Sequence, residues 1–242
     1  HRAARKYGLL CLTGTEFDAD AFGTHFHIVG LDFDTNNSAI TELFAKTSSR
    51  ERIRSEILFN RSKENGWLKD KDITWEDVVD LHPHNDYLCN NQIFVTLMNK
   101  GLATKSDYSE FFKDFRWRED REEELAPIIN RPMPTVGETI ETILNAGGIP
   151  VLAHPLEQLD YIPELVKLGL KGVEINHPIL TKEEMAVLPD IADKYNLYKS
   201  AGTDHSGVLG GFTELGDRFV IADDVGVINE EHFMEIYNRV KG

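Results

Sequence analysis

Residues 147–155 read GGIPVLAHP, and this short run predicts a helix end, a buried strand and a polar residue at the strand end. Thr135 is placed to cap a helix that runs to Asn145, and the two glycines then end that helix. The apolar residues from 149 to 153 predict a buried strand, which stops at His154. Polar side chains at the ends of buried strands are how α/β enzymes build their active faces.

The sequence after this run continues to alternate between helix and strand. The next two strands stop at Asn176-His177 and at the GTDH sequence of residues 202–205. Because helices and strands alternate with short connections, we expect a parallel sheet or a barrel. The predicted helices are 161–168 and one capped by Thr181 that ends at Tyr195, and the predicted strands are 9–13 (ending at Gly14 and Glu16), 24–33, 172–175 and 197–200.

The stretch between the second and third predicted strands has a different pattern. Apolar residues such as Ile40, Leu43 and Phe44 recur there at helical spacing between charged residues. We therefore interpret residues 38–134 as a helical insertion subdomain, with predicted helices over 92–100 and 107–124. It interrupts an α/β domain whose two parts are residues 1–37 and 135–242.

Composition narrows the class of protein. The chain has 242 residues and a net charge of −15, from 41 acidic and 26 basic side chains. This charge argues against a broad nucleic-acid-binding surface, but not against a local site for one small phosphate ester. The two cysteines cannot form a disulfide framework, so we expect a cytoplasmic protein. No apolar run is long enough to predict a membrane span.

Four side chains at the ends of predicted strands have the chemistry of metal ligands. Imidazole and carboxylate are groups that bind Zn, Mn and Fe in proteins. Since the strand ends of a barrel converge on one rim, we expect these side chains to lie together and to bind divalent metal ions. They are Glu16, His27, His154 and Asp204, with His205 next to the last of them.

Each of these residues also has a simpler interpretation. Glu16 fits a solvated loop acid that caps a turn, and His154 fits a hydrogen-bonded core histidine. Asp204 and His205 form a pair that is also common in ordinary turns. No G-x-S-x-G, P-loop or Rossmann glycine pattern follows a predicted strand, which disfavours a serine nucleophile and the common nucleotide-binding loops.

Two more histidines are candidates for substrate contact. His25 and His27 are two residues apart, so both lie on one face of the predicted strand, where the pair also fits a plain polar surface. We prefer His27 as the metal ligand because the strand that follows it is more apolar. His25 and His177 are then the expected substrate-binding residues.

Taken in order along the chain, five motifs resemble those of the PHP (polymerase and histidinol phosphatase) family. The resemblance covers the whole chain except for the register of the insertion. The insertion is similar to that of the metal-dependent phosphoesterase branch, which includes nucleotide-bisphosphate phosphatases and a 5′–3′ exoribonuclease. The motifs are LTGTE at 12–16, HIVGL at 27–31, VLAHP at 151–155, GVEINHP at 172–178 and GTDH at 202–205.

The resemblance implies a distorted (β/α)7 barrel with two or three divalent metal ions, which would be Mn, Zn or Fe. Glu16 would bridge two metals, and the other ligands would be His27, His154 and Asp204. His205 would bind a further metal or orient the phosphate. The residues central to catalysis would be Glu16, His154 and Asp204.

The sequence departs from the family pattern at three places. PHP domains open with an H-x-H strand and a later Asp-His strand end, and neither precedes Glu16, so we expect an N-terminally incomplete barrel with further ligands upstream. His205 directly follows Asp204, whereas the family places this histidine two residues after the aspartate. Asn90-Asn91-Gln92 replaces an Arg-x-His pair of the phosphoesterase branch, which argues against a nucleotide 3′-phosphate as substrate.

We therefore expect a metal-dependent hydrolase that cleaves a small phosphate monoester, a nucleotide or an oligonucleotide end with metal-activated water. Two alternatives stay open. One is a metal hydrolase of the same fold that cleaves a non-phosphate bond. The other is a catalytically inactive binding domain, which the altered 204–206 sequence and the absent H-x-H strand favour.

Overall fold

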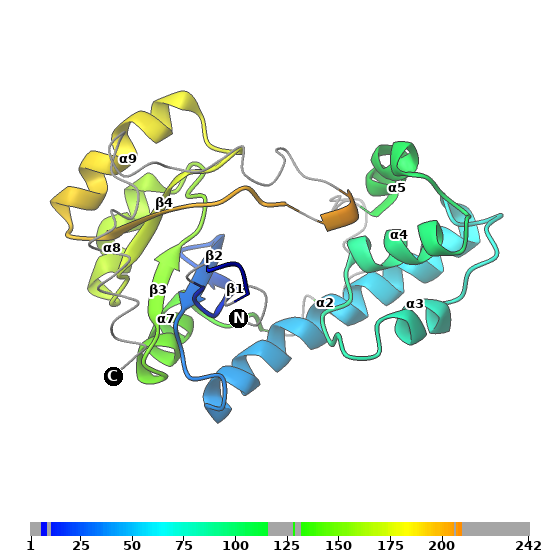
Figure 1. Cartoon of the computed structure of the whole chain (residues 1–242), viewed down its shortest axis with the longest axis horizontal. Coiled ribbons are helices and arrows are strands. Elements are labelled where there is room, and N and C mark those ends of the chain that lie inside the picture. Colours follow the sequence, from blue (N-terminus) through cyan, green and yellow to red (C-terminus); the bar gives the residue numbers. More distant parts are fainter. Residues whose placement is uncertain (1–5, 9–10, 116–127, 129–131, 206, 210–242) are drawn as a thin grey trace. The chain divides into compact units, whose positions relative to one another are not determined.

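The computed structural model describes residues 6–8, 11–115, 128, 132–205 and 207–209 (Figure 1). The chain divides into two compact units. The first contains residues 1–43, 134–205 and 211–242, and the second contains residues 44–133 and 206–210. The second unit is therefore inserted into the sequence of the first, and the long helix α2 (Ser38–Asn65) begins in one unit and ends in the other.

The first unit is built on a five-stranded sheet in the order β1-β2-β3-β4-β5. Its first three strands are antiparallel neighbours, and its last three are parallel. Within the part of the chain that the structure describes this sheet is open, so the (β/α)7 barrel stays a prediction. The strands are β1 (Gly14–Ala21), β2 (Thr24–Leu31), β3 (Ile149–Leu152), β4 (Gly172–Asn176) and β5 (Tyr198–Ala201), and the helices are α7 (Val136–Asn145), η3 (Leu159–Tyr161), α8 (Ile162–Lys167) and α9 (Lys182–Lys194).

The parallel half of the sheet confirms the predicted alternation of helix and strand. Every residue of β3 is buried, as expected for a parallel strand covered on both faces. The helices begin where their caps predict. The side chain of Thr135 accepts a hydrogen bond from the backbone N–H of Glu138, and Thr181 does the same for Glu184, each at 3.1 Å.

The first strand differs from the predicted one. The sequence predicts a strand over 9–13 that ends at Gly14 and Glu16. Residues 9 and 10 lie outside the described ranges and residues 11–13 are not in a strand, whereas β1 begins at Gly14 and contains Glu16 within it. It turns back into β2 through Phe22 and Gly23, whose φ values of 54° and 76° are those of a two-residue hairpin turn. Aspartate is uncommon in strands, so Asp18 and Asp20 concealed the alternating pattern in this segment.

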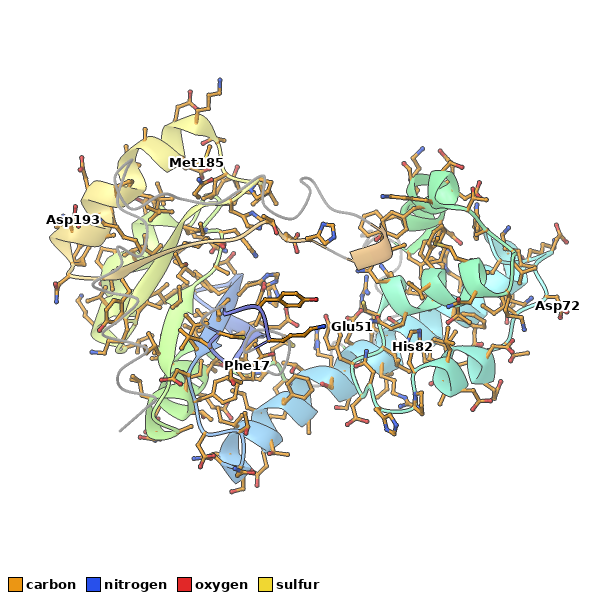
Figure 2. All side chains as sticks on the ribbon, viewed as in Figure 1. Phe17, Glu51, Asp72, His82, Met185 and Asp193 are labelled. Atoms are coloured by element: carbon orange, nitrogen blue, oxygen red, sulfur yellow. The ribbon has the colours of Figure 1, made fainter. Side chains whose placement is uncertain are left out.

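The core of the first unit lies against one face of the hairpin. Phe17 of β1 (labelled in Figure 2) and Phe26 and Ile28 of β2 are at most 1% exposed. They belong to one buried cluster with Ile140 and Ile143 of α7. Because successive strand residues point to opposite faces, the residues between these apolar positions form a separate, more exposed face.

The second unit is helical. An aromatic group of Phe94, Phe111 and Phe115 is completely buried at its centre. Only part of the predicted helix over 107–124 is described, as α5 (Tyr108–Phe115), and residues 116–124 lie outside the described ranges. No helix within those ranges is long and apolar enough to cross a membrane. Besides α2, the helices are α3 (Trp75–Leu81), α4 (Asn90–Asn99), η1 (Lys105–Asp107), α5 (Tyr108–Phe115) and η4 (Gly207–Leu209).

Candidate metal centre

Acids and histidines alternate on the exposed face of the β1–β2 hairpin. The antiparallel register sets Asp18 opposite His27 and Asp20 opposite His25. Glu16 lies on the same face, two residues before Asp18. Since opposed side chains in such a pair have Cβ atoms about 4.5–5.5 Å apart, each of these acids reaches an imidazole. The hairpin thus supplies several potential metal donors on one face.

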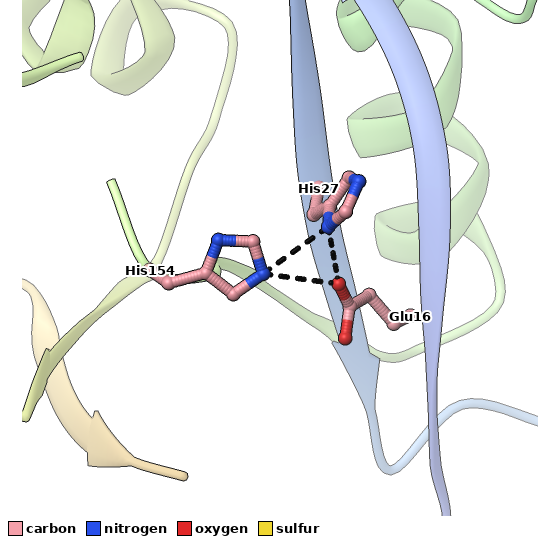
Figure 3. Close-up of side chains that lie close together, drawn as sticks. All are labelled: Glu16, His27 and His154. Carbon is pink, nitrogen blue, oxygen red and sulfur yellow. Dashed lines mark hydrogen bonds and ion pairs between the residues drawn. The ribbon is translucent and has the colours of Figure 1, made fainter. Parts of the chain in front are cut away.

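Glu16, His27 and His154 form the first group of donors (Figure 3). Oε1 of Glu16 lies 2.6 Å from Nδ1 of His27 and 3.3 Å from Nε2 of His154. The two ring nitrogens are 3.1 Å from each other. In a tetrahedral site with bonds of about 2.0–2.2 Å, donor atoms are about 3.3–3.6 Å apart. The three atoms are therefore close to the spacing that one metal ion requires.

A second group on the same face consists of Asp18, His25 and His27. Oδ1 of Asp18 lies 3.1 Å from Nε2 of His25 and 3.3 Å from Nε2 of His27. His25 also contacts Asp20 through Nδ1, at 2.8 Å. His27 belongs to both groups and faces the first with Nδ1 and the second with Nε2.

These groups strongly perturb each other's protonation. Burial opposes the ionisation of His27, but hydrogen bonds to Asp18 and Glu16 raise its pKa to about 10. Burial also opposes the ionisation of Glu16, and hydrogen bonds from His154 and His27 outweigh it and lower the pKa of Glu16 to about 2. A metal ion that binds these nitrogens must displace their protons, so its affinity is expected to rise with pH.

The third donor, His154, sits at the end of β3 in an unusual backbone conformation. Its φ of 23° lies in the left-handed region, which is rare and strained for a residue other than glycine. Its backbone N–H donates a 2.7 Å hydrogen bond to Oε2 of Glu174, on β4. Glu174 is only 9% exposed, and burial raises its pKa to about 7. This buried carboxyl group thus holds the strand end that carries a metal donor.

His177 lies behind His154 and is buried. The two ring centroids are 4.9 Å apart. Nδ1 of His177 accepts a 3.2 Å hydrogen bond from the backbone N–H of Ile179, so the ring hydrogen is on Nε2. The ring of His177 therefore lies next to that of His154, and substrate contact by His177 stays a prediction.

The other predicted site residues lie outside the first group of donors. Asp204 and His205 belong to neither group, although the charge of Asp204 contributes to the raised pKa of Glu174. Both ring nitrogens of His25 lie within hydrogen-bond distance of carboxylates, with Nδ1 near Asp20 and Nε2 near Asp18. The ligand roles of Asp204 and His205 and the substrate role of His25 therefore stay predictions.

Two residues of the site were not singled out from the sequence. Asp18 lies beyond the strand that the sequence predicts over 9–13, although the alternation of Phe17 and Ala19 with acids marks one strand face. Glu174 was missed because it lies within an apolar strand. An acid flanked by valine and isoleucine in a parallel strand is itself a signal of function, since such a charge is costly to bury.

Two enzymes with established names are similar to this chain in sequence. One is the phosphoribosyl 1,2-cyclic phosphate 1,2-diphosphodiesterase of Eggerthella lenta, 26% identical over 222 residues, which are 88% of this chain and 79% of the enzyme. The other is a 5′-3′ exoribonuclease of Haemophilus influenzae, 27% identical over 234 residues, which are 92% of this chain and 79% of the enzyme. No family model matches the chain.

Two solved structures share the fold. A protein of Bifidobacterium adolescentis described as a metal-dependent phosphoesterase superposes with a TM-score of 0.71 at 24% identity, over 98% of this chain and 79% of the other. An amidohydrolase of Chromobacterium violaceum, solved with sulfate and without metal, gives a TM-score of 0.65 at 19% identity, over 98% and 80%. All four similar proteins bear names of hydrolases, and the donor set of Glu16, His27 and His154 fits a divalent metal ion.

Proposed function

We propose that this hydrolase is a metal-dependent phosphoesterase with a PHP-type fold. The observation that supports the proposal is the approach of Oε1 of Glu16, Nδ1 of His27 and Nε2 of His154 to within 2.6–3.3 Å of one another. The relatives named as a cyclic phosphodiesterase and an exoribonuclease indicate the type of bond. The proposed substrate is a small phosphate ester, a nucleotide or the end of an oligonucleotide.

The charges of the three donors suit a phosphate. Glu16 contributes one negative charge, and the two histidines are neutral when their nitrogens bind a metal ion. A dication held by these donors leaves a local charge of about +1, which attracts a phosphate despite the net charge of −15 on the chain. When bound there, the ion would polarise a phosphoryl oxygen and lower the pKa of a water molecule.

The neighbouring residues have proposed supporting roles. Glu174 fixes the backbone of His154 and thereby aims its ring at Glu16. His177, whose ring centroid lies 4.9 Å from that of His154, is the proposed substrate contact. Asp204 and His205 are the proposed ligands of a further ion, so that the complete centre would hold two or three ions of Mn, Zn or Fe.

A hydrolysis assay tests this function. The full-length protein is incubated with Mn²⁺, Zn²⁺ or Fe²⁺ and with a phosphodiester, a phosphomonoester and a short 5′-phosphorylated RNA. Glu16→Gln and His154→Ala are expected to reduce phosphate release to the background without metal. Asp20→Asn is the matched control, because Asp20 lies on the same strand face and hydrogen-bonds His25 instead of the three donors. Equal activity of the wild type, Glu16→Gln and His154→Ala would overturn the proposal.

The same assay separates the two alternatives. Amide and lactone substrates are included, because a metal-activated water does not by itself select the bond it attacks. Cleavage of these substrates without phosphate release would indicate a hydrolase of a non-phosphate bond. Elemental analysis that finds no metal in the full-length protein, together with no hydrolysis, would indicate an inactive binding domain.

A further inference from the structure

Asp18 lies next to the candidate metal centre but outside its donor set, and its position is set by the hairpin. The antiparallel register places it directly opposite His27. Its Oδ1 lies 3.3 Å from Nε2 of His27, the ring nitrogen that points away from Glu16 and His154. The imidazole of His27 therefore stands between the donor set on one side and a carboxylate on the other.

This arrangement determines where the ring hydrogen of His27 must be when a metal is bound. A metal ion takes the lone pair of Nδ1, so the single hydrogen of the neutral ring is on Nε2. Oδ1 of Asp18, 3.3 Å from Nε2, lies within reach of that hydrogen. Histidines that bind metals usually donate their second N–H to a carboxylate or carbonyl in this way, which fixes the tautomer and the ring orientation.

Asp18 is itself held in place from the other side. Nε2 of His25 lies 3.1 Å from the same Oδ1. The backbone carbonyl of His25 accepts a 2.8 Å hydrogen bond from Nε2 of Gln158. The carboxylate thus has a defined orientation toward His27, which a positioning role requires.

The competing interpretation is that Asp18, His25 and His27 bind a second ion of their own. His27 would then have to give one nitrogen to each ion and lose both ring hydrogens. A neutral imidazole offers only one lone pair, so a His27 ring that binds two ions must be an imidazolate anion. If Asp18 only accepts the hydrogen of Nε2, the ring of His27 stays neutral. The geometry therefore favours Asp18 as a hydrogen-bond acceptor over Asp18 as a ligand.

We infer that Asp18 is a positioning residue that orients His27 and selects its metal-binding tautomer. The inference rests on the proposed metal centre, because it assigns a role relative to the ion that Glu16, His27 and His154 would hold. If Asp18 has this role, its substitution changes the metal affinity of the protein but not the number of ions bound.

The test measures Co²⁺ binding to the full-length protein by calorimetry and by the visible absorption of the bound ion. Asp18→Ala is expected to weaken Co²⁺ binding about 10–100-fold at unchanged stoichiometry and to alter the absorption spectrum. Asp18→Asn, of nearly the same shape, keeps an oxygen that can accept, so a smaller loss is expected and folding is preserved. Asp20→Ala is the matched control, with affinity and spectrum like those of the wild type.

Three results would overturn the inference. Wild-type affinity in both Asp18 variants would show that Asp18 does not act on His27. Loss of one bound ion per chain would make Asp18 a ligand. Absence of Co²⁺ binding in the wild type would overturn the metal centre together with this inference, whereas the first two results leave the centre intact.

Discussion

The backbone N–H of His154 and Oε2 of Glu174, 2.7 Å apart, connect the end of β3 to the neighbouring strand β4. This hydrogen bond comes from a residue with a φ of 23°, so it stabilises a conformation that histidine rarely adopts. With this backbone the ring of His154 faces Glu16, and its Nε2 lies 3.3 Å from the carboxylate. A buried acid thereby shapes the candidate metal centre without belonging to its donors.

Substitution of Glu174 tests whether its hydrogen bond to the backbone of His154 supports the site. Glu174→Ala leaves the N–H of His154 without its partner and is expected to lower the free energy of unfolding by about 1–3 kcal/mol. Metal affinity is expected to fall as well, because His154 is no longer fixed. Urea denaturation and calorimetric Zn²⁺ titration measure the two effects. Glu174→Gln is the matched control, since its amide oxygen can still accept. Glu174→Ala with wild-type affinity would show that His154 is held by other contacts.

Gly202 allows the approach of the 202–205 loop to the same acid. A Cβ atom at this position would overlap Oε1 of Glu174 and lie 3.6 Å from Cδ2 of His177. Gly202→Ala is therefore expected to destabilise the protein by about 1–3 kcal/mol through overpacking. Thermal unfolding measures the change. In Gly137→Ala, the control within α7, the new Cβ has 3.8 Å to its nearest neighbour, so this variant is expected to be neutral or slightly more stable. A loss no greater in Gly202→Ala than in Gly137→Ala would contradict the contact.

The pKa of His27 predicts how stability depends on pH when no metal is present. Burial lowers this pKa, but the hydrogen bonds to Asp18 and Glu16 raise it to about 10, above the unfolded value of about 6.5. The protonated ring therefore contributes stability that is fully present below about pH 6.5 and lost as the pH rises through about 10. Urea denaturation in the presence of a metal chelator is expected to show a free energy of unfolding that falls from pH 7 to pH 10. His27→Gln is expected to show a shallower decline, and parallel curves would count against the assignment.

In the helical unit, the hydrogen bonds of Asp114 predict an effect on stability alone. Its carboxylate accepts hydrogen bonds from Oγ of Ser62 at 2.5 Å, the backbone N–H of Trp67 at 2.9 Å and Nη2 of Arg61 at 2.7 Å. Asp114→Ala removes these three side-chain hydrogen bonds in a mostly buried place and is expected to cost about 3 kcal/mol. Chemical denaturation measures the loss, while Zn²⁺ affinity below the transition is expected to be unchanged. Glu110→Gln on α5, which breaks an exposed pair with Lys113, is the control with no measurable change. A loss of metal affinity in Asp114→Ala would contradict the separation of these roles.

The parallel half of the fold could be predicted because its signals are local. Thr135 and Thr181 mark helix starts, and the apolar residues before His154 mark a buried strand. The hairpin could not be predicted in this way. Its turn uses Phe22 at a position with positive φ where asparagine or glycine is usual, so the sequence gives no hairpin signal there.

The candidate site likewise has a part that local sequence signals predict and a part that they do not. Glu16, His27 and His154 lie together, and Glu16 reaches the site from within a strand and not from its end. The role of Asp18 depends on cross-strand register, which no local pattern in the sequence fixes. The close approach of Gly202 to the carboxylate of Glu174 is likewise revealed only by the folded chain.

The central claim is that Glu16, His27 and His154 hold one divalent metal ion. Anomalous diffraction at the zinc edge, from crystals of the full-length protein grown with Zn²⁺, tests it most directly. The account predicts an anomalous peak about 2.0–2.2 Å from Oε1 of Glu16, Nδ1 of His27 and Nε2 of His154. Zinc-loaded crystals with no anomalous peak within bonding distance of these three atoms would contradict it.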